Sequence, residues 1–335
     1  MVTSAKPGTT DRSKPSSGRP PRGGRTLRQQ ENRAGLALIS PTLLVVLVVV
    51  VLPIVWTLIL AFQQVRLINI RDTGLFEGYT LDNFVTVLGS PGFWSSLVTT
   101  TAYAVGGTVL SLFLGLVAAL ALRRPFRGRG IMRGAMLLPY VAPVVAVAFV
   151  WEVMLSPQYG IINEWGTKLF GWDEPIAFLT QRETTLSVLG MEIPVPVALL
   201  TVIVFEGWRY FPFAFLFLLA RLQAVPKDLE EAAVVDGATP TQRFRHIIFP
   251  QLASVIALLA MLRFVMNFNK FDDVYLLTGG GSGTDVASVR VYDFLTARFD
   301  VGAASAQALV LAAVLLVFLA VYLKFFAPSP ENKDS

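Results

Sequence analysis

Six long apolar stretches, separated by polar segments, dominate the sequence. Each is long enough for the roughly 20 apolar residues that cross about 30 Å of hydrocarbon, so each predicts a transmembrane helix. Prolines inside the first stretch are compatible with a bilayer helix, because neighbouring groups can bond the freed carbonyls. The pattern predicts an all-α integral membrane protein with spans near residues 36–62, 96–122, 131–155, 195–220, 252–277 and 303–327.

Composition supports this class and removes several kinds of site. Hydrophobic residues make up 54% of the chain and charged residues 15%, whereas a soluble domain has about 25% charged residues. The chain contains no cysteine and a single histidine, which excludes disulfides, thiolate metal sites and histidine-cluster metal sites. We therefore expect no metal site and no cofactor.

The basic residues are unevenly distributed along the chain. They collect in the tail 1–34, in 123–133 after the second apolar stretch and in 221–245 after the fourth, whereas the intervening loops are acidic or neutral. Because cytoplasmic segments carry the excess of Lys and Arg, this distribution places both termini in the cytoplasm. No groove-reading motif accompanies the charge, so we expect contact with anionic membrane lipids and not with nucleic acid.

The two ends of the chain differ from its apolar body. Residues 1–34, rich in Pro, Gly, Ser, Lys and Arg, predict a disordered basic tail, because few apolar side chains offset the entropy of ordering. The apolar stretch that follows is too long for a secretory signal and lacks a small-x-small cleavage site, so we expect it to remain as a transmembrane helix. Residues 328–335 are expected to form a second cytoplasmic tail.

The polar segment 225–250 has the pattern of two short helices joined by a tight bend. Acidic residues after Pro226 suit the positive end of a helix dipole. Gly237 breaks this helix, and Thr239 can cap a second one that reaches Pro250 ahead of the fifth apolar stretch. The residues alone leave two interpretations open, an amphipathic loop on the lipid headgroups and a docking surface for another protein.

The spacing of residues in this segment favours the docking surface. The segment contains E-A-A-x-x-D-G-A, followed by an aromatic residue and a proline. This pattern closely resembles the EAA loop of ABC importer permeases, which in that family is a coupling helix in a cleft of the cytoplasmic ATPase. The resemblance implies a role in ATPase coupling for Glu231, Ala232, Ala233, Asp236, Gly237, Ala238, Phe244 and Pro250.

The resemblance covers residues 80 to about 330 and extends to the carbohydrate subgroup of these permeases. The sequence LLPYVAPVVAVAFVWEVMLSPQYGIINEW at 137–165 is similar to the third span of that subgroup, and FDDVYLLTGGGSGTD at 271–285 is similar to its last extracellular loop. The subgroup is the maltose, trehalose and glycerol-phosphate type. It implies a type-1 ABC importer permease fold over 80–327, preceded by a first transmembrane helix and an extracellular loop at 35–79.

The same resemblance implies a set of partners in the bacterial plasma membrane. These are a second, different permease subunit, two cytoplasmic ABC ATPase subunits and an extracytoplasmic solute-binding lipoprotein, which together import a mono-, di- or oligosaccharide. The chain lacks the G-x-x-x-x-G-K-[ST] loop that binds nucleotide phosphates, and the glycines at 279–285 have no lysine. We therefore expect a non-catalytic subunit, and the aromatic-rich loop 156–194 is a candidate docking surface for the binding protein.

Polar residues inside the apolar stretches are candidates for contact with the solute, because charge in a bilayer is costly and often functional. In the fourth stretch an acid and a base three residues apart share a helix face, beside two aromatic residues that could stack on a sugar. In the fifth, three polar residues follow the spacing i, i+4, i+7. Structural pairing inside the bundle is the favoured interpretation for the acid and base of the fourth stretch, whereas solute contact and a polar contact between helices are equally favoured for the fifth. The candidates are Glu206, Trp208, Arg209, Tyr210, Arg263, Asn267 and Lys270.

Three other functions compete with sugar import. A glycerol-3-phosphate or polyol-phosphate importer would need more cavity cations than Arg263 and Lys270 supply, which favours a neutral sugar. A secondary transporter that works alone would show paired inverted repeats, and the sequence shows no repeat. A membrane enzyme would need a constellation of reactive groups, whereas the lone His246 lies in the polar segment without a suitable carboxylate partner.

Overall fold

The structure is a computed structural model that describes residues 27–69, 74, 78–188 and 191–326. The tails predicted at residues 1–26 and 328–335 lie outside these ranges. The chain divides into two units, residues 1–56 and 57–335.

The first helical segment consists of α1 (Leu27–Val46), a π-helical turn η1 (Leu47–Val51) and α2 (Leu52–Ala61). The helix starts at Leu27, so the prediction that residues 27–34 belong to a disordered tail is wrong. The π-helical turn ends two residues before Pro53, whose ring would clash with the carbonyl four residues earlier in a regular α-helix. The wider turn accommodates this proline without ending the apolar helix.

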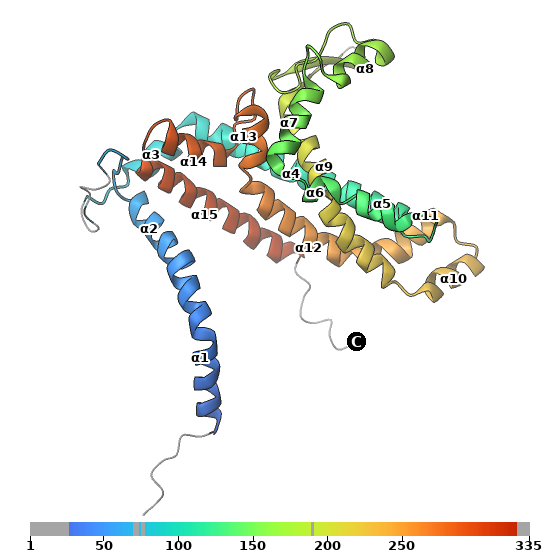
Figure 1. Cartoon of the computed structure of the whole chain (residues 1–335), viewed down its shortest axis with the longest axis horizontal. Coiled ribbons are helices and arrows are strands. Elements are labelled where there is room, and N and C mark those ends of the chain that lie inside the picture. The colour runs from blue at the N-terminus through green and yellow to red at the C-terminus, as the bar shows by residue number, and fades with distance from the viewer. Residues whose placement is uncertain (1–26, 70–73, 75–77, 189–190, 327–335) are drawn as a thin grey trace, which may run out of the picture. The chain divides into compact units, whose positions relative to one another are not determined.

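Four long helices form the centre of the second unit: α4 (Pro91–Ala121), α9 (Val197–Gln223), α12 (Phe249–Phe268) and α15 (Val301–Phe326). They lie side by side in Figure 1, with α4 packed along α9 and α12, and α12 in contact with α15. The described residues contain five helices long and apolar enough to cross a membrane, or six if one bent pair is counted as a single span.

That bent pair occupies the third apolar stretch. Helices α5 (Arg129–Ala135) and α6 (Leu138–Val141) are followed by α7 (Val144–Leu155), which turns away by 93°. Figure 1 shows α7 leaving the direction of the long helices. The cause is Pro143, because the residue before a proline is forced out of helical geometry, and Ala142 is extended here with ψ 143°. The prediction of one continuous helix over 131–155 is therefore wrong.

The fifth apolar stretch is also shifted from its predicted position. Helix α11 (Pro240–Arg243) runs through a π-helical turn η2 (Phe244–Ile248) into α12, which ends at Phe268. A separate helix α13 (Asp272–Thr278) follows. The span thus covers Pro240–Phe268 and not 252–277. As in the first segment, the π-helical turn ends two residues before a proline, here Pro250.

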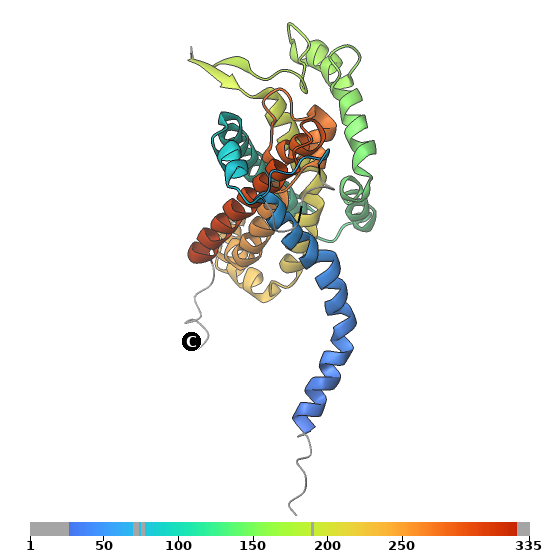
Figure 2. The same ribbon diagram turned by 90° about the vertical axis from the view of Figure 1, so that its left-hand side faces the viewer.

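Shorter elements surround the long helices. Helices α3 (Asp82–Leu88) and α14 (Ala287–Thr296) pack against α15. After α7 come α8 (Ile161–Phe170) and an antiparallel hairpin of β1 (Thr184–Val188) and β2 (Met191–Val195), paired from Thr184 with Val195 (Figure 2). Asn163 holds this loop together: its amide donates to the carbonyl of Ile176 at 3.0 Å and accepts from the same residue's N–H at 2.7 Å.

Small residues allow α4 and α9 to approach closely. A Cβ placed on Gly115 of α4 would lie 2.6 Å from Cβ of Ala214 and 2.8 Å from the backbone nitrogen of Phe215 in α9. One placed on Gly107 would lie 2.7 Å from Cγ of Glu206. Membrane helices lack a hydrophobic force between them and associate through such close contact. The α4–α9 pair is therefore fixed at a short separation.

Gly115→Ala should destabilise the protein by about 1–3 kcal/mol, because the added methyl group meets backbone atoms of α9 that cannot move aside. Gly134→Ala in α5 is the matched control, since a Cβ there meets nothing within 4 Å. Both changes replace a helical glycine by alanine and so alter helix propensity equally. A lower melting temperature of Gly115→Ala than of Gly134→Ala in detergent therefore measures the cost of the lost packing. Equal melting temperatures for the two variants would contradict the close α4–α9 contact.

Candidate functional site

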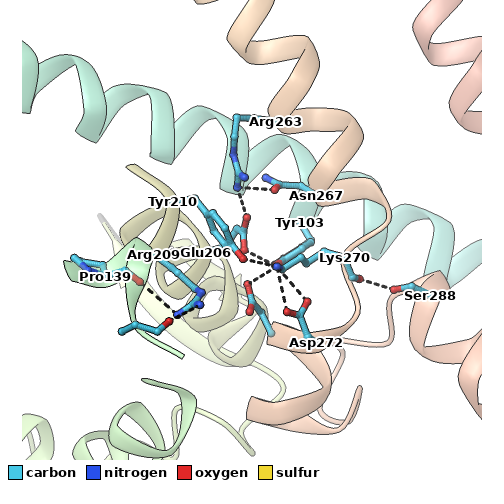
Figure 3. A network of polar contacts seen from close by, with 12 residues as sticks. Tyr103, Pro139, Glu206, Arg209, Tyr210, Arg263, Asn267, Lys270, Asp272 and Ser288 are labelled. Atoms are coloured by element: carbon cyan, nitrogen blue, oxygen red, sulfur yellow. Dashed lines mark hydrogen bonds and ion pairs between the residues drawn. The ribbon is translucent and has the colours of Figure 1, made fainter. Parts of the chain in front are cut away.

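A buried ion pair joins α9 to α12. Glu206 of α9 and Arg263 of α12 are in contact, and each side chain is only 1% exposed. Arg263 also donates to Oδ1 of Asn267 at 2.7 Å, and Tyr103 of α4 donates its hydroxyl to the second oxygen of Glu206 at 3.1 Å. The amide of Asn267 continues the network to Oγ1 of Thr108 at 3.2 Å. Figure 3 shows these side chains converging from three helices.

Lys270 forms the more exposed edge of the same network. Its ammonium donates to the hydroxyl of Tyr210 and lies 3.1 Å from Asp272 and 3.5 Å from Asp273 (Figure 3). The ring of Tyr210 lies 4.3 Å from the Arg263 guanidinium and 4.6 Å from the Lys270 ammonium, within the range of cation–π attraction. Side-chain exposure is 15% for Lys270 and 46% for Asp272, so this edge is more exposed than the Glu206–Arg263 pair.

Lys270 reaches this network from outside the helix that was predicted to carry it. Because α12 ends at Phe268, the expected i, i+4, i+7 stripe with Arg263 and Asn267 does not exist. Lys270 instead lies in the connection to α13, where its carbonyl accepts a hydrogen bond from Ser288 (Figure 3). The three residues are brought together by tertiary contacts and not by helical periodicity.

Arg209 has a different partner from its neighbour Glu206. Its guanidinium donates to the carbonyl of Ala142 at 3.0 Å and approaches that of Pro139 at 3.4 Å (Figure 3). The carbonyl of Pro139 would accept from the N–H of residue 143 in a regular helix, but Pro143 has no N–H. Arg209 therefore satisfies carbonyls exposed by the helix break. A structural role inside the bundle, the favoured interpretation for this residue, agrees with these contacts.

Trp208 stays outside the polar network. Its ring centroid lies 5.5 Å from that of Trp151, and both rings line an apolar groove of about 460 Å³ between α7 and α9. The remaining lining residues are small or aliphatic: Ala142, Ala146, Val147, Val150 and Met154. Trp208 and Tyr210 are therefore placed on separate surfaces, one apolar and one polar.

Both cations of the network are paired with carboxylates. Arg263 contacts Glu206, and Lys270 lies beside Asp272 and Asp273. Among the described residues, no group of three or more His, Asp or Glu side chains is arranged to hold a metal ion. The site can thus offer hydrogen bonds and an aromatic face to a neutral polar molecule, but no surplus positive charge.

Tyr103 and Thr108 are members of this network that the sequence pattern did not reveal. Both lie in α4, in a stretch whose spacing resembles any apolar span with scattered hydroxyl groups. Their partners are more than 100 residues away along the chain, so no local signal could connect them.

The 225–250 segment has the predicted bend. Helix α10 (Lys227–Val235) ends with the N–H of Ala238 bonded to the carbonyl of Ala233 at 2.8 Å and that of Gly237 to Val234 at 3.0 Å. This pair of backbone hydrogen bonds requires a residue in the left-handed conformation, which is Gly237 with φ +78°. Thr239 caps α11 and forms a reciprocal capping box with Gln242, which confirms its predicted role.

The second helix of the segment is not short, which corrects the prediction. It continues through Pro250 into α12. Phe244 packs against Phe249, with ring centroids 5.9 Å apart, and so belongs to the bundle. The exposed residues of the coupling pattern are Glu231, Ala232, Asp236 and Gly237, while Ala233 and Ala238 are half-buried and Pro250 is exposed on the long helix.

One ion pair connects this segment to α4. Arg123, just beyond the end of α4, contacts Glu230 of α10. Burial and the neighbouring Arg124 lower the pKa of Arg123, so the guanidinium is in an environment where an acidic partner is favourable. The two side chains are 21% and 20% exposed.

The fold and its polar centre define a multi-pass membrane protein of the transport type. Residues 111–329 match the family of binding-protein-dependent transport system inner membrane components, and the chain belongs to this family. It is therefore a permease subunit of the inner membrane.

Curated relatives match over nearly the whole chain. The trehalose/maltose transport system permease protein MalF of Thermococcus litoralis is 33% identical over 89% of this chain and 95% of its own length. The trehalose transport system permease protein SugA of Mycobacterium tuberculosis is 31% identical over 92% and 94%. The inner membrane ABC transporter permease protein YcjO of Escherichia coli is 35% identical over 86% and 92%.

Solved structures share the fold. A crystal structure of a bacterial ABC transporter that imports the acidic polysaccharide alginate contains a chain with TM-score 0.74 and 22% identity, over 89% of this chain and 96% of that one. The same kind of transporter in complex with a periplasmic protein bound to an alginate pentasaccharide gives TM-score 0.73, 23% identity and coverage of 90% and 98%. The likeness establishes the ABC importer permease fold predicted from the sequence.

Glu206→Leu should lower the free energy of unfolding by about 3–5 kcal/mol, because Arg263 then keeps a buried charge without its partner. The double variant Glu206→Leu/Arg263→Leu should recover most of this loss, since both charges are removed. Chemical unfolding of the purified protein in detergent measures both. Glu164→Leu, which breaks the exposed pair with Lys168, is the control and should change stability little. A double variant as unstable as the single one would contradict this account.

Proposed function

We propose that this chain is the permease subunit of an ATP-driven importer of a neutral sugar. The observation that carries the proposal is a polar network whose two cations are both paired with carboxylates, beside an aromatic face, in a chain of the binding-protein-dependent family. Sugar hydroxyls need donors and acceptors, and a sugar ring stacks on aromatic side chains. Tyr210, Lys270 and Asp272, at the exposed edge, are the residues assigned to the solute.

Two lines of support favour a sugar. Several relatives carry trehalose, maltose or maltodextrin in their names, including the maltodextrin transport system permease protein MalC of Streptococcus pneumoniae. In this chain, Lys270 and Arg263 are already paired with carboxylates. A glycerol-3-phosphate or polyol-phosphate importer would need unpaired cations for bidentate phosphate contacts, so the network disfavours that alternative.

The 225–250 segment is proposed to couple the chain to two cytoplasmic ABC ATPases. Its exposed face carries Glu231, Ala232 and Asp236, and the small side chains let another protein approach the backbone. Closure of the ATPases on ATP would move α10, and with it the ends of α9 and α12 that flank it. That motion shifts the equilibrium between outward and inward access.

The remaining partners follow from the same proposal. A second, different permease subunit completes the pore, and an extracytoplasmic solute-binding lipoprotein delivers the sugar to the loop that contains α8 and the β1–β2 hairpin. The exposed aromatic residues of that loop, Tyr159, Trp165 and Phe170, offer it a contact surface. The basic segments and both termini lie on the cytoplasmic side of the plasma membrane, as the distribution of Lys and Arg requires.

The proposal is tested by tagging the chain in its native cell and purifying it in mild detergent. We expect a second permease, an ATPase and a lipid-anchored binding protein to co-purify. Deletion of the chain should abolish ATP-dependent uptake of radiolabelled trehalose, and excess unlabelled glycerol-3-phosphate should not compete. Competition by glycerol-3-phosphate would show that the solute is a phosphate ester and not a neutral sugar. Transport by the chain alone, without an ATPase, would contradict the coupling role.

Gly237→Pro and Glu231→Lys should each abolish trehalose uptake while membrane insertion stays intact. Proline cannot adopt φ +78°, so the bend after α10 is lost. Gly237→Asn is the control, because asparagine tolerates the left-handed region and should retain uptake. For the charge reversal, Asp228→Lys on the same helix is the control. Normal uptake in both test variants would remove the coupling assignment.

A further inference from the structure

Helix α10 is weakly attached to the rest of the protein. None of its residues is buried, and Leu229, Val234 and Val235 expose about half or more of their surface. In the part of the chain that the structure describes, the Arg123–Glu230 ion pair is the only side-chain hydrogen bond or salt bridge between α10 and another element. Covalent connections join α10 to α9 and α11.

The covalent connections reach α9 and α12 but not α4. The Arg123–Glu230 pair supplies the missing connection, across 107 positions of sequence. On the α4 side the anchor is firm: Arg133 of α5 donates to the carbonyl of Leu122 at 2.9 Å, and Arg129 approaches the carbonyl of Arg123 at 3.4 Å. Arg123 thus lies in a turn that other side chains stabilise, and it contacts α10, which has few contacts of its own.

The middle of α4 takes part in the buried polar network. Tyr103 bonds to Glu206, and Thr108 bonds to Asn267. Helix α4 has 31 residues, which makes it roughly 45 Å long. Its close contact with α9 through Gly107 and Gly115 leaves little freedom to bend or slide separately. A force applied near Arg123 is therefore transmitted along α4 to the network.

We propose that Arg123 is a positioning residue that clamps α10 to α4, so that movement of α10 by the ATPases displaces α4 together with α9 and α12. The inference rests on the coupling role proposed for the 225–250 segment. Without the clamp, α10 can move while α4 stays, and ATP hydrolysis is no longer matched by opening of the solute path. The expected defect is therefore uncoupling and not loss of folding.

Proximity is tested first, independently of transport. The chain has no cysteine, so Arg123→Cys/Glu230→Cys introduces the only two thiols. A short bismaleimide is the suitable reagent, because two long side chains in contact leave their Cβ atoms farther apart than the roughly 4 Å of a disulfide. We expect linked peptides by mass spectrometry in native membranes. Arg123→Cys/Glu164→Cys is the control, since α8 stands apart from α10 (Figures 1 and 2). No link between 123 and 230 would overturn the inference.

Coupling is tested by charge exchange in the complete transporter. Arg123→Glu and Glu230→Arg should each lower trehalose moved per ATP hydrolysed about tenfold, which corresponds to about 1.4 kcal/mol. The double variant Arg123→Glu/Glu230→Arg should return to within about twofold of the wild type, because the pair is restored with reversed sign. Arg124→Glu and Asp228→Arg are matched controls, being adjacent or same-helix charges without this contact.

The outcomes separate the two proposals. A cross-link with normal transport in both single variants would make the pair a passive contact and overturn the positioning role alone. The positioning role would also be overturned if the single variants lost ATP hydrolysis and transport equally, or if the double variant Arg123→Glu/Glu230→Arg did not restore coupling. If the wild-type complex shows no ATP-dependent uptake of trehalose, maltose or maltodextrin, the proposed function fails and the positioning role falls with it, whatever the cross-link shows.

Discussion

The buried ion pair between Glu206 and Arg263 is the contact on which the helical bundle depends. Opposite charges inside an apolar bundle are tolerated only while each keeps its partner and the other polar atoms are bonded. Meeting that requirement fixes α9 against α12 and, through Tyr103 and Asn267, fixes α4 as well. The close approach at Gly107 follows from the same constraint, because a larger residue there would displace the glutamate.

Prolines impose a second constraint, and the protein meets it in two ways. Pro53 and Pro250 each follow a π-helical turn, which keeps an apolar helix continuous past a missing hydrogen bond. Pro143 instead breaks its helix, and Arg209 reaches across from α9 to bond the exposed carbonyls. In a bilayer, freed backbone groups cannot be left to water, so at these three prolines a partner side chain or a local change of helix geometry compensates.

A permease must join a solute path within the membrane to an energy source outside it. In this chain one continuous helix, α4, extends from the polar network to the turn that contacts α10. Both cations of the network are paired with carboxylates, which suits a neutral solute that exchanges its hydration for hydrogen bonds. The loosely held α10 suits contact with a partner, because a helix with no buried residues moves at little cost to packing.

The sequence by itself determined the membrane class and the bend at Gly237, because these depend on apolar length and on local backbone chemistry. It also placed Glu206, Arg209, Tyr210, Arg263 and Asn267 among the polar residues of the bundle. Their partners were decided only by tertiary structure: Arg209 bonds carbonyls of another helix, and Lys270 meets Tyr210 from beyond the end of α12. Helical periodicity orders residues along one element, but contacts between elements more than 50 residues apart depend on how the helices pack. The shifted fifth span and the broken third have the same origin, since a proline's effect depends on whether neighbouring groups can bond the carbonyls that it frees.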